Sequence, residues 1–415
     1  MSDTLRIPPE VEVVDERGRP VPDVAVSFRV VEGGGSIEAV PALTGADGRV
    51  ATTRWVLGPG PGSNVVEARA EGLAPARFTA TGRTAIQVAV GLNHSCLLDS
   101  GGTVRCWGNN RNGQLGTGDT LASPTPTPVI GGLSFTSVSA AELHTCGLTA
   151  AGQAFCWGWG VSGQLGDGSY QSAASPRAVS GGYRFANVRA GPGATCGVTV
   201  GGQVLCWGYL LQAGIYDSTP TPLSIPPGSG STDDLAIGRL GQVCALSPPG
   251  APRCVPGGTG YYGGASDVQQ IGLGKVSVCG VSRSLGVVCQ GQTPAGPIIP
   301  VALPSPAEHL SEHWSQWSGN LSEADSGCVG VMASGVYCWT PNNGPTTAAL
   351  QPGTEALGRI TSLATAQGHV CVVTRMGAVW CWGQNTMGQL GDGTLEPSAT
   401  PVRVHLFNKG RVPPR

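Results

Sequence analysis

Charged side chains are scarce in this chain. Asp, Glu, Lys and Arg together make up 12% of the 415 residues, whereas globular proteins average ~25%. The formal net charge is −2, and the basic residues form no cluster along the sequence. The electrostatic surface that attracts a phosphate backbone is therefore missing, and we expect no nucleic-acid partner.

Long apolar runs are missing as well. No stretch approaches the ~18 consecutive apolar residues that a membrane-spanning helix needs, so we expect no membrane span. The first residues, from Met1 to Arg6, lack the apolar core of a signal peptide. No secretory leader is therefore visible in the sequence.

Motifs for catalysis and cofactor binding are equally rare. The chain contains no His-Glu-x-x-His, no Gly-x-Ser-x-Gly and no Walker loop. Residues 258–263 match a dinucleotide-binding fingerprint by letters, but no helical pattern follows them and the chain holds 66 glycines. We interpret that match as chance. We therefore expect a protein that is not an enzyme, with no catalytic residues, no metal site and no cofactor.

Cysteine, by contrast, is abundant and regularly placed. The fourteen cysteines form seven pairs, each separated by ten residues. Between Cys96 and Cys106 come apolar residues, then turn residues around Gly101, then alternating β-formers, which is typical of a hairpin. Such a turn sets the two cysteines opposite each other, within reach of a disulfide. We predict seven intra-hairpin disulfides: Cys96–Cys106, Cys146–Cys156, Cys196–Cys206, Cys244–Cys254, Cys279–Cys289, Cys328–Cys338 and Cys371–Cys381.

The alternative role for the cysteines is zinc binding. Zinc sites usually contain Cys-x2-Cys pairs whose four ligands converge, whereas these pairs are wide and are spread along the chain. We therefore favour disulfides, which persist in oxidising compartments. This choice predicts an extracellular or cell-surface location, although no leader is visible in this sequence.

Seven copies of one β unit predict a closed ring of seven blades. The copies occupy residues 84–406, and a C-terminal tail covers 407–415. Each copy contains a strand, the cysteine hairpin, a glycine loop such as residues 113–116, and a proline-marked outer segment such as residues 126–129. Proline suits an edge strand, where the missing N–H costs little. We expect the ring to close between the first strand and the last segment, residues 400–405.

These repeats resemble the regulator of chromosome condensation repeat family. Residues 106–119 read CWGNNRNGQLGTGD and residues 381–393 read CWGQNTMGQLGDG, both close to the family's signature. Copies one, two and seven match well, copy three replaces the glycine loop by residues 210–214, and copies four and five lose the tryptophan. The resemblance implies a seven-bladed propeller. The family includes a nuclear exchange factor, a plant photoreceptor and a secreted bacterial β-lactamase inhibitor, so the fold leaves the function open.

Residues 1–83 have a different character. They contain no cysteine, and their short strands at regular spacing predict a small β-sandwich. They resemble the bacterial Ig-like repeats of invasin- and intimin-type surface proteins, through DERGRPVPDV (15–24), GGGS (33–36), TGADGRV (44–50) and FTATG (78–82). That family usually has another strand before Ile7. We therefore expect an unpaired sheet edge near residues 10–13.

Two residue types recur at fixed positions in the copies. His94, His144 and His369 precede a first cysteine by two residues. They could line a channel and bind a metal, but we favour structural histidines that are hydrogen-bonded to a neighbouring blade. The tryptophans that follow the second cysteine indicate packing between blades; they are Trp107, Trp157, Trp207, Trp339 and Trp382.

We expect other aromatic residues to lie in inter-strand loops, outside the shared positions. Loops on a rigid scaffold usually carry binding, and aromatic residues are enriched in binding hot spots. The alternative is that these side chains pack beneath their own loops. The candidate binding residues are Trp159, Tyr170, Tyr209, Tyr216, Tyr261, Tyr262 and Trp314.

These observations favour a non-enzymatic, secreted or cell-surface bacterial protein. The all-β propeller would be a rigid recognition scaffold for a protein or glycan ligand, and the Ig-like domain a spacer or an anchor. One alternative is the structural subunit of an extracellular fibre, assembled when another chain's strand completes the Ig-like sheet. A second alternative is a secreted enzyme-inhibitor-like propeller or a polysaccharide lyase.

Overall fold

The computed structural model describes the chain in parts and divides it into two compact units. One unit comprises Met1–Thr84 with Met376–Ala378, and the other comprises Ala85–Arg375 with Val379–Arg415. The described residues are 9–38, 42–52, 54–57, 62–212, 215–224, 234–237, 243–247, 251–255, 258–259, 268–273, 277–282, 286–291, 298–303, 307–310, 327–331, 335–339, 346–347, 349–366 and 368–405.

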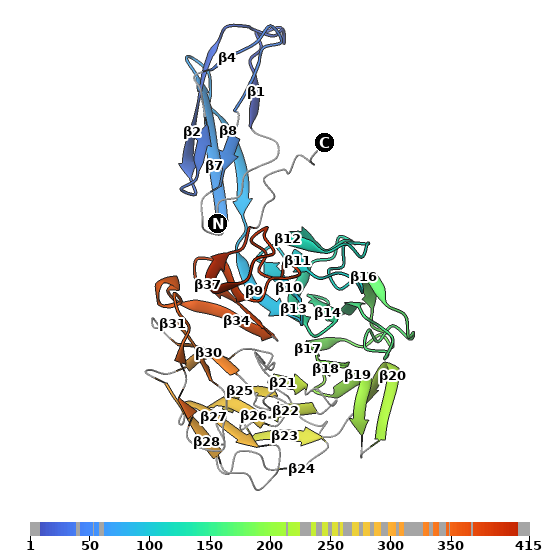
Figure 1. Ribbon diagram of the computed structural model, residues 1–415. Helices are drawn as coiled ribbons and strands as arrows, with labels where there is room; N and C mark the ends of the chain where they lie inside the picture. Colours follow the sequence, from blue (N-terminus) through green and yellow to red (C-terminus); the bar gives the residue numbers. More distant parts are fainter. Residues whose placement is uncertain are drawn as a thin grey trace. The chain divides into compact units, whose positions relative to one another are not determined.

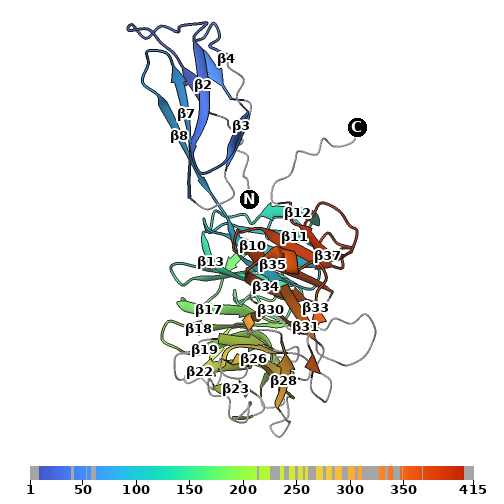
Figure 2. The same ribbon diagram turned by 90° about the vertical axis from the view of Figure 1, so that its left-hand side faces the viewer.

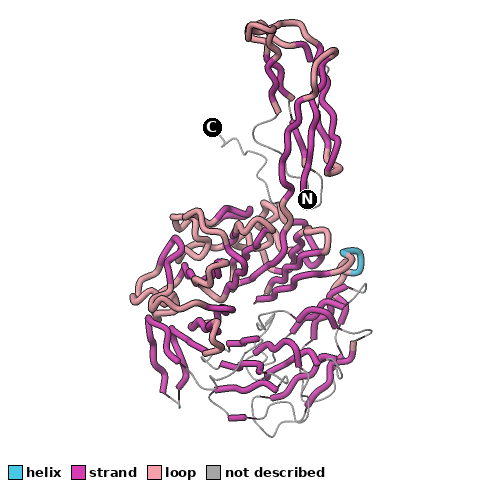
Figure 3. The backbone as a smooth tube through the Cα atoms, turned by 180° about the vertical axis from the view of Figure 1, so that it is seen from behind, coloured by secondary structure: helices cyan, strands magenta, loops and turns pink. Residues whose placement is uncertain are grey.

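Strands make up nearly all the regular structure of these residues (Figure 3). The helix found in the described ranges is η1 (Glu355–Leu357), a single 3-10 turn. Within those ranges, no helix has the length and apolar character needed to cross a membrane. The expected all-β class is therefore confirmed.

The N-terminal unit consists of three antiparallel sheets around one core. β2 (Ala25–Glu32) and β7 (Gly62–Ala70) are the central strands of a four-stranded sheet, whose outer strands are β4 (Ala42–Leu43) and β8 (Ala76–Gly82). Two small sheets pair β1 (Glu10–Glu12) with β5 (Arg49–Ala51), and β3 (Ser36–Glu38) with β6 (Arg54–Val56).

Period-two alternation builds the core of this unit. In β2, Val26 and Phe28 are buried, whereas Ser27 and Arg29, which alternate with them, are exposed. All three sheets contribute to the same apolar cluster, so they fold as one body. The buried members of the cluster are Val26, Phe28, Val50, Trp55, Leu57, Val66 and Ala68.

The strand at residues 10–12 has a partner. β1 runs antiparallel to β5, with Val11 opposite Val50. Arg49 supports the pairing through ion pairs with Glu10 (3.6 Å) and Glu12 (3.3 Å). Among the described strands, β5 is the only neighbour of β1. The extra strand of the resembled Ig-like family would fall before residue 9, outside the described residues.

The second unit contains seven sheets in its described residues (Figure 1). The first holds β9 (Ala85–Val90), β10 (His94–Asp99), β11 (Val104–Gly108) and β12 (Ser123–Pro128). The second holds β13 (Phe135–Ala140), β14 (His144–Thr149), β15 (Ala154–Gly158) and β16 (Ala173–Ala178). The third holds β17 (Phe185–Ala190), β18 (Ala194–Thr199), β19 (Val204–Gln212) and β20 (Ile215–Ser224).

Of the remaining four sheets, the fourth to the sixth are less regular. The fourth holds β21 (Asp234–Ile237), β22 (Val243–Ser247), β23 (Ala251–Val255) and the two-residue β24 (Gly258–Thr259). The fifth holds β25 (Val268–Leu273), β26 (Ser277–Ser282), β27 (Gly286–Gly291) and β28 (Ile298–Ala302), with β32 (Thr346–Thr347) added in parallel. The sixth holds β29 (Ala307–Leu310), β30 (Gly327–Val331), β31 (Gly335–Trp339) and β33 (Ala349–Leu350). The seventh holds β34 (Ile360–Ala366), β35 (His369–Thr374), β36 (Val379–Gly383) and β37 (Ser398–Arg403).

The sheets form a closed ring through their first strands. These strands contact one another in the order β9, β13, β17, β21, β25, β29 and β34, and β34 contacts β9. Figure 2 shows the first and last sheets next to each other. The expectation that residues 400–405 join the two ends is wrong, because β37 pairs with β36 of its own sheet. The two ends of the repeat region do meet, as expected, with the inner strands β34 and β9 in contact.

Each cysteine hairpin has the register that the ten-residue spacing predicts. In all seven hairpins the two cysteines are directly opposed. Disulfides with Cα separations of 4.0–4.2 Å join five pairs, Cys96–Cys106, Cys146–Cys156, Cys196–Cys206, Cys279–Cys289 and Cys371–Cys381. Cys244 and Cys338 are also disulfide-bonded, and Cys254 and Cys328 are the residues opposite them.

Candidate functional site

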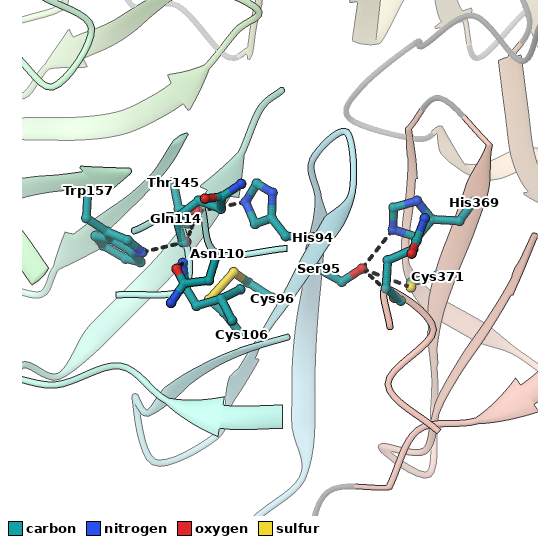
Figure 4. The surroundings of a disulfide bond; sticks show 12 residues. His94, Ser95, Cys96, Cys106, Asn110, Gln114, Thr145, Trp157, His369 and Cys371 are labelled. Carbon is teal, nitrogen blue, oxygen red and sulfur yellow. Dashed lines mark hydrogen bonds between the residues drawn. A yellow bond between two sulfur atoms is a disulfide. The ribbon is translucent and has the colours of Figure 1, made fainter. Parts of the chain in front are cut away.

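Buried polar side chains join the first sheet to the second (Figure 4). His94 begins β10, and its Nε2 lies 2.9 Å from Oγ1 of Thr145 on β14. The Thr145 hydroxyl donates to the main-chain carbonyl of Gln114 at 3.0 Å. Nε1 of Trp157 donates to the same carbonyl at 3.0 Å. We call this arrangement the interlock: a histidine and a glutamine carbonyl of one sheet are bound by a hydroxyl and an indole of the next.

The interlock recurs at two further interfaces. Between the second and third sheets its members are His144, Thr195, Gln164 and Trp207, with distances of 2.8, 2.9 and 3.0 Å. Between the seventh and first sheets they are His369, Ser95, Gln389 and Trp107, with distances of 2.8, 3.0 and 2.8 Å. The ring is therefore closed by the same contacts that join its consecutive sheets.

The hydrogen-bond directions determine the histidine tautomer. The Thr145 hydroxyl donates to a carbonyl, so its oxygen is an acceptor and His94 must donate through Nε2–H. Nδ1 of His94 and Nδ1 of His369 then carry lone pairs, and both atoms are buried without a hydrogen-bond partner. Burial lowers the pKa of each ring from 6.5 to about 3. Both rings are neutral at pH 7, which supports the structural interpretation of these histidines.

Asn110 shapes the glycine loop that supplies the Gln114 carbonyl. Its Nδ2 donates to Oγ1 of Thr117 at 3.1 Å, and its Oδ1 accepts from the N–H of Leu115 at 2.9 Å. Asn385 makes the equivalent bond to the N–H of Leu390 in the seventh sheet, also at 2.9 Å.

Glycine is required where this loop touches the neighbouring indole. Gly391 has φ +70°, a conformation that side chains disfavour. A Cβ added there would lie 2.6 Å from Nε1 of Trp107. Gly116 and Gly166 stand in the same relation to Trp157 and Trp207. The loop can therefore reach its neighbour only without a side chain at this position.

The interlock is replaced at two other interfaces of the described region. Between the third and fourth sheets, Ala194 stands at the histidine position and packs in an aliphatic cluster with Leu235 and Ile237 of β21. Between the sixth and seventh sheets, Val370 stands at the hydroxyl position. Trp382 follows the second cysteine there, and its buried Nε1 has no hydrogen-bond partner among the described residues. Apolar packing holds the sheets together at both interfaces.

Three of the candidate aromatic residues lie at one end of the ring. Neighbouring strands are antiparallel, so the connections after the first and third strands of a sheet lie at one end and the turn after the second strand at the other. Trp159 and Tyr170 follow β15, and Tyr209 lies on β19 directly after Gly208. We call this the aromatic end. Tyr170 is 47% exposed, and the other two side chains are half-buried.

Trp159 and Tyr209 occupy a shared repeat position, contrary to expectation. The N–H of each donates to a carbonyl in the connection after the first strand of its own sheet, at 2.9 and 2.8 Å. Asn109 and Gln384 occupy this position in the first and seventh sheets, with the same type of hydrogen bond. One rigid backbone position thus carries four different polar or aromatic side chains around the ring.

The third sheet replaces the glycine loop by a hairpin. β19 and β20 continue to pair beyond Gly208, with Tyr209 opposite Ser218 and Leu211 opposite Tyr216. The backbone of Tyr216 therefore also belongs to the aromatic end. The other candidates, Tyr261, Tyr262 and Trp314, lie outside the described residues.

Family models agree with the pattern of the repeats. Two models described as Regulator of chromosome condensation (RCC1) repeat match the chain. One covers residues 85–114, 135–164 and 360–389, and the other covers residues 101–148, 151–198 and 376–412. These segments cover copies one, two and seven and extend into the first two strands of copy three, which confirms the expectation that copies one, two and seven match well.

Two solved structures have a similar fold. Prp20p from Saccharomyces cerevisiae, described with its binding to Gsp1p and histones, is 14% identical with a TM-score of 0.59, covering 78% of this chain and 87% of that chain. Yeast RCC1 (Prp20) bound to Kap60 is 13% identical with a TM-score of 0.57, covering 77% of this chain and 85% of that chain. At these identities the likeness concerns the fold.

Removing a hydroxyl from the interlock should destabilise the ring. Thr145→Val keeps the side-chain shape but leaves the Nε2–H of His94 without its acceptor. We expect the free energy of unfolding to fall by about 1–3 kcal/mol, as measured by urea denaturation, and Thr195→Val to behave alike. The control Thr136→Val removes a hydroxyl that bonds within its own sheet. An equal loss in the control would contradict the role of the interlock.

The neutral histidines should make the ring sensitive to acid. Their pKa is about 3 in the folded protein, against 6.5 for an unperturbed histidine side chain such as that of the unfolded chain. Below pH 6.5 these histidines are therefore protonated in the unfolded chain but not in the folded one. Their contribution to stability is fully present above pH 6.5 and is lost as the pH falls toward 3. We expect each buried histidine to lower the free energy of unfolding by about 2 kcal/mol between pH 7 and pH 5.

The measurement is the free energy of unfolding at pH 7 and pH 5 for the parent and for His94→Gln. Glutamine does not titrate, so this variant should lose less stability over the interval. His405→Gln, at an exposed position, is the matched control. If all three proteins show the same pH dependence, the buried histidine is not its source.

Proposed function

We propose, from the premise that the repeat region is an RCC1-type repeat propeller, that this protein is a non-enzymatic binding protein. In this proposal the propeller has seven blades, and it binds a protein partner through its aromatic end. The N-terminal unit is an Ig-like module that acts as a spacer or an anchor. The protein works outside a bacterial cell or on its surface.

The observation that carries the binding proposal is the shared position of Trp159 and Tyr209. The two residues lie on neighbouring sheets, and the main-chain N–H of each makes the same hydrogen bond within its own sheet. Tyr170 adds an exposed aromatic ring from the same connection as Trp159. Aromatic side chains on a rigid scaffold lose little conformational entropy on binding, which favours their use as anchors.

A protein partner fits this end better than a glycan. The connections at the aromatic end also expose the aliphatic side chains of Leu121, Val161 and Leu395. Mixed aliphatic and aromatic surface is typical of the centre of a protein interface. The yeast relative of this fold is itself described as binding proteins, namely Kap60, Gsp1p and histones. These are partners of the yeast protein, and they support a protein as the class of ligand.

The disulfides support the proposed location. The described part of the chain holds no free cysteine, and five hairpins show complete disulfides. Such bonds persist outside the cytosol. Function at a bacterial surface would also suit a module that holds the propeller away from its point of attachment.

The test compares two exposed tyrosines at opposite ends of the ring. The partner is first identified by cross-linking on the producing cells, and its affinity is then measured with purified proteins. Tyr170→Ala and Trp159→Ala should each weaken binding about tenfold. Tyr183→Ala, in the connection after β16 at the other end, should leave it unchanged. Equal effects at both ends, or a glycan as the cross-linked ligand, would contradict the proposal.

Assembly into a fibre is a second candidate function. It is favoured by β1, which has one neighbouring strand among those described and could receive a strand from another chain. The expected donor is the C-terminal tail at residues 404–408. Static light scattering at high concentration should then show growing assemblies that disappear when residues 404–415 are removed. A strictly monomeric protein would contradict this candidate.

A further inference from the structure

A buried carboxylate lies under three arginines on the N-terminal unit. In the register of the four-stranded sheet, Glu67 of β7 is directly opposite Arg29 of β2 and Arg77 of β8. Arg69 lies two residues further along β7, on the same face. This face is opposite to the core, because Val66 and Ala68 of β7 point into the buried cluster. Four charged residues thus share the outer face of three adjacent strands.

All three guanidinium groups bind the same carboxylate. Oε1 of Glu67 accepts from Arg69 Nε at 2.5 Å and from Arg29 at 3.0 Å, and Oε2 accepts from Arg77 Nε at 3.1 Å. The side chain of Glu67 is 1% exposed. The bond from Arg69 is the largest cause of a pKa lowered to about 2, and bonds from Arg29 and Arg77 add to it. The carboxylate therefore stays ionised and holds the arginines in place.

The cluster carries more positive than negative charge. Three cations surround one anion, and Glu67 is the acid in all three of the ion pairs that these described arginines make. Their side chains are 58%, 52% and 68% exposed for Arg29, Arg69 and Arg77. Each guanidinium has five N–H donors, and Glu67 takes one or two of them. The remaining donors face solvent from groups whose positions are already fixed.

We propose that Arg29, Arg69 and Arg77 form a binding site for an acidic polysaccharide, with Glu67 as the residue that positions them. Guanidinium groups form paired hydrogen bonds with carboxylate and sulfate groups, which such glycans repeat along the chain. Because the arginines are already ordered, binding costs little side-chain entropy. This site lies on a different unit from the aromatic end and does not depend on the partner proposed there.

The surroundings favour a glycan over a protein partner. Ser27 and Thr79 extend the same outer face with hydroxyl groups, and the next cross-strand row holds the buried Val65 between Thr79 and Glu32. No aromatic side chain occupies this face among the described residues of β2, β7 and β8. An open, polar sheet face with ordered cations lacks the aromatic anchors of protein hot spots, but it can accept a flat, hydroxyl-rich and negatively charged chain.

The test uses the full chain and two defined polyanions, heparin as a sulfated glycan and polygalacturonate as a carboxylated one. Arg77→Gln and Arg29→Gln should each weaken binding about tenfold at low ionic strength. Arg77→Lys keeps the charge but loses the paired geometry, so it should weaken binding to an intermediate degree. Arg19→Gln is the matched control, since Arg19 is 70% exposed and paired with Asp15 on the same unit; it should bind as the parent does.

Three outcomes would overturn the proposal. The first is that neither glycan binds the parent protein. The second is that Arg19→Gln weakens binding as much as Arg77→Gln does. The third is that duplex DNA binds as tightly as both glycans. The last result would mean general attraction of polyanions without recognition of a glycan. Each single substitution leaves Glu67 with two arginines, and the melting temperature of each variant verifies that the N-terminal unit remains folded.

Discussion

The ring depends on a backbone carbonyl that its own sheet does not satisfy. The carbonyl of Gln114 receives both of its hydrogen bonds, from a hydroxyl and an indole, from the next sheet. A buried carbonyl without donors costs ~1–3 kcal/mol. An isolated copy would therefore leave this carbonyl without a hydrogen bond. Where the interlock occurs, stability therefore belongs to the interfaces as much as to the sheets, as expected for repeat proteins. The seventh sheet meets the first through the same groups, which gives the closed ring no distinct seam at this point.

The sequence was sufficient for the hairpins but not for the interlock. Cysteine spacing and turn chemistry are local, so the disulfide register could be read directly. The role of Thr145 could not, because it depends on a histidine that belongs to the preceding copy. A signal was present: His94, His144 and His369 are each followed, in the next copy around the ring, by a serine or threonine before the first cysteine. The copy after Ala194 has Val243 there instead. Comparing neighbouring copies, instead of each copy with a consensus, would have found the pairing.

The shared position of two residues at the aromatic end could not be recognised from the sequence either. Trp159 and Tyr209 looked irregular because their types differ from those of Asn109 and Gln384, although all four occupy one backbone position. A position can be fixed by its main-chain hydrogen bond while its side chain remains free to vary. The arginines around Glu67 could not be recognised either, since β2, β7 and β8 are separated in sequence and only their register brings the charges together.

The contact between the last sheet and the first has a consequence for folding during synthesis. Trp107 and its acceptor on Gln389 are 282 residues apart in sequence. At ~5–20 residues per second, synthesis of the intervening chain takes on the order of tens of seconds. Throughout that time the first sheet holds a hydroxyl and an indole N–H whose native acceptor does not yet exist, beside an apolar face that awaits its neighbour. The nascent chain must therefore keep its first sheet from pairing elsewhere until Gln389 has been synthesised.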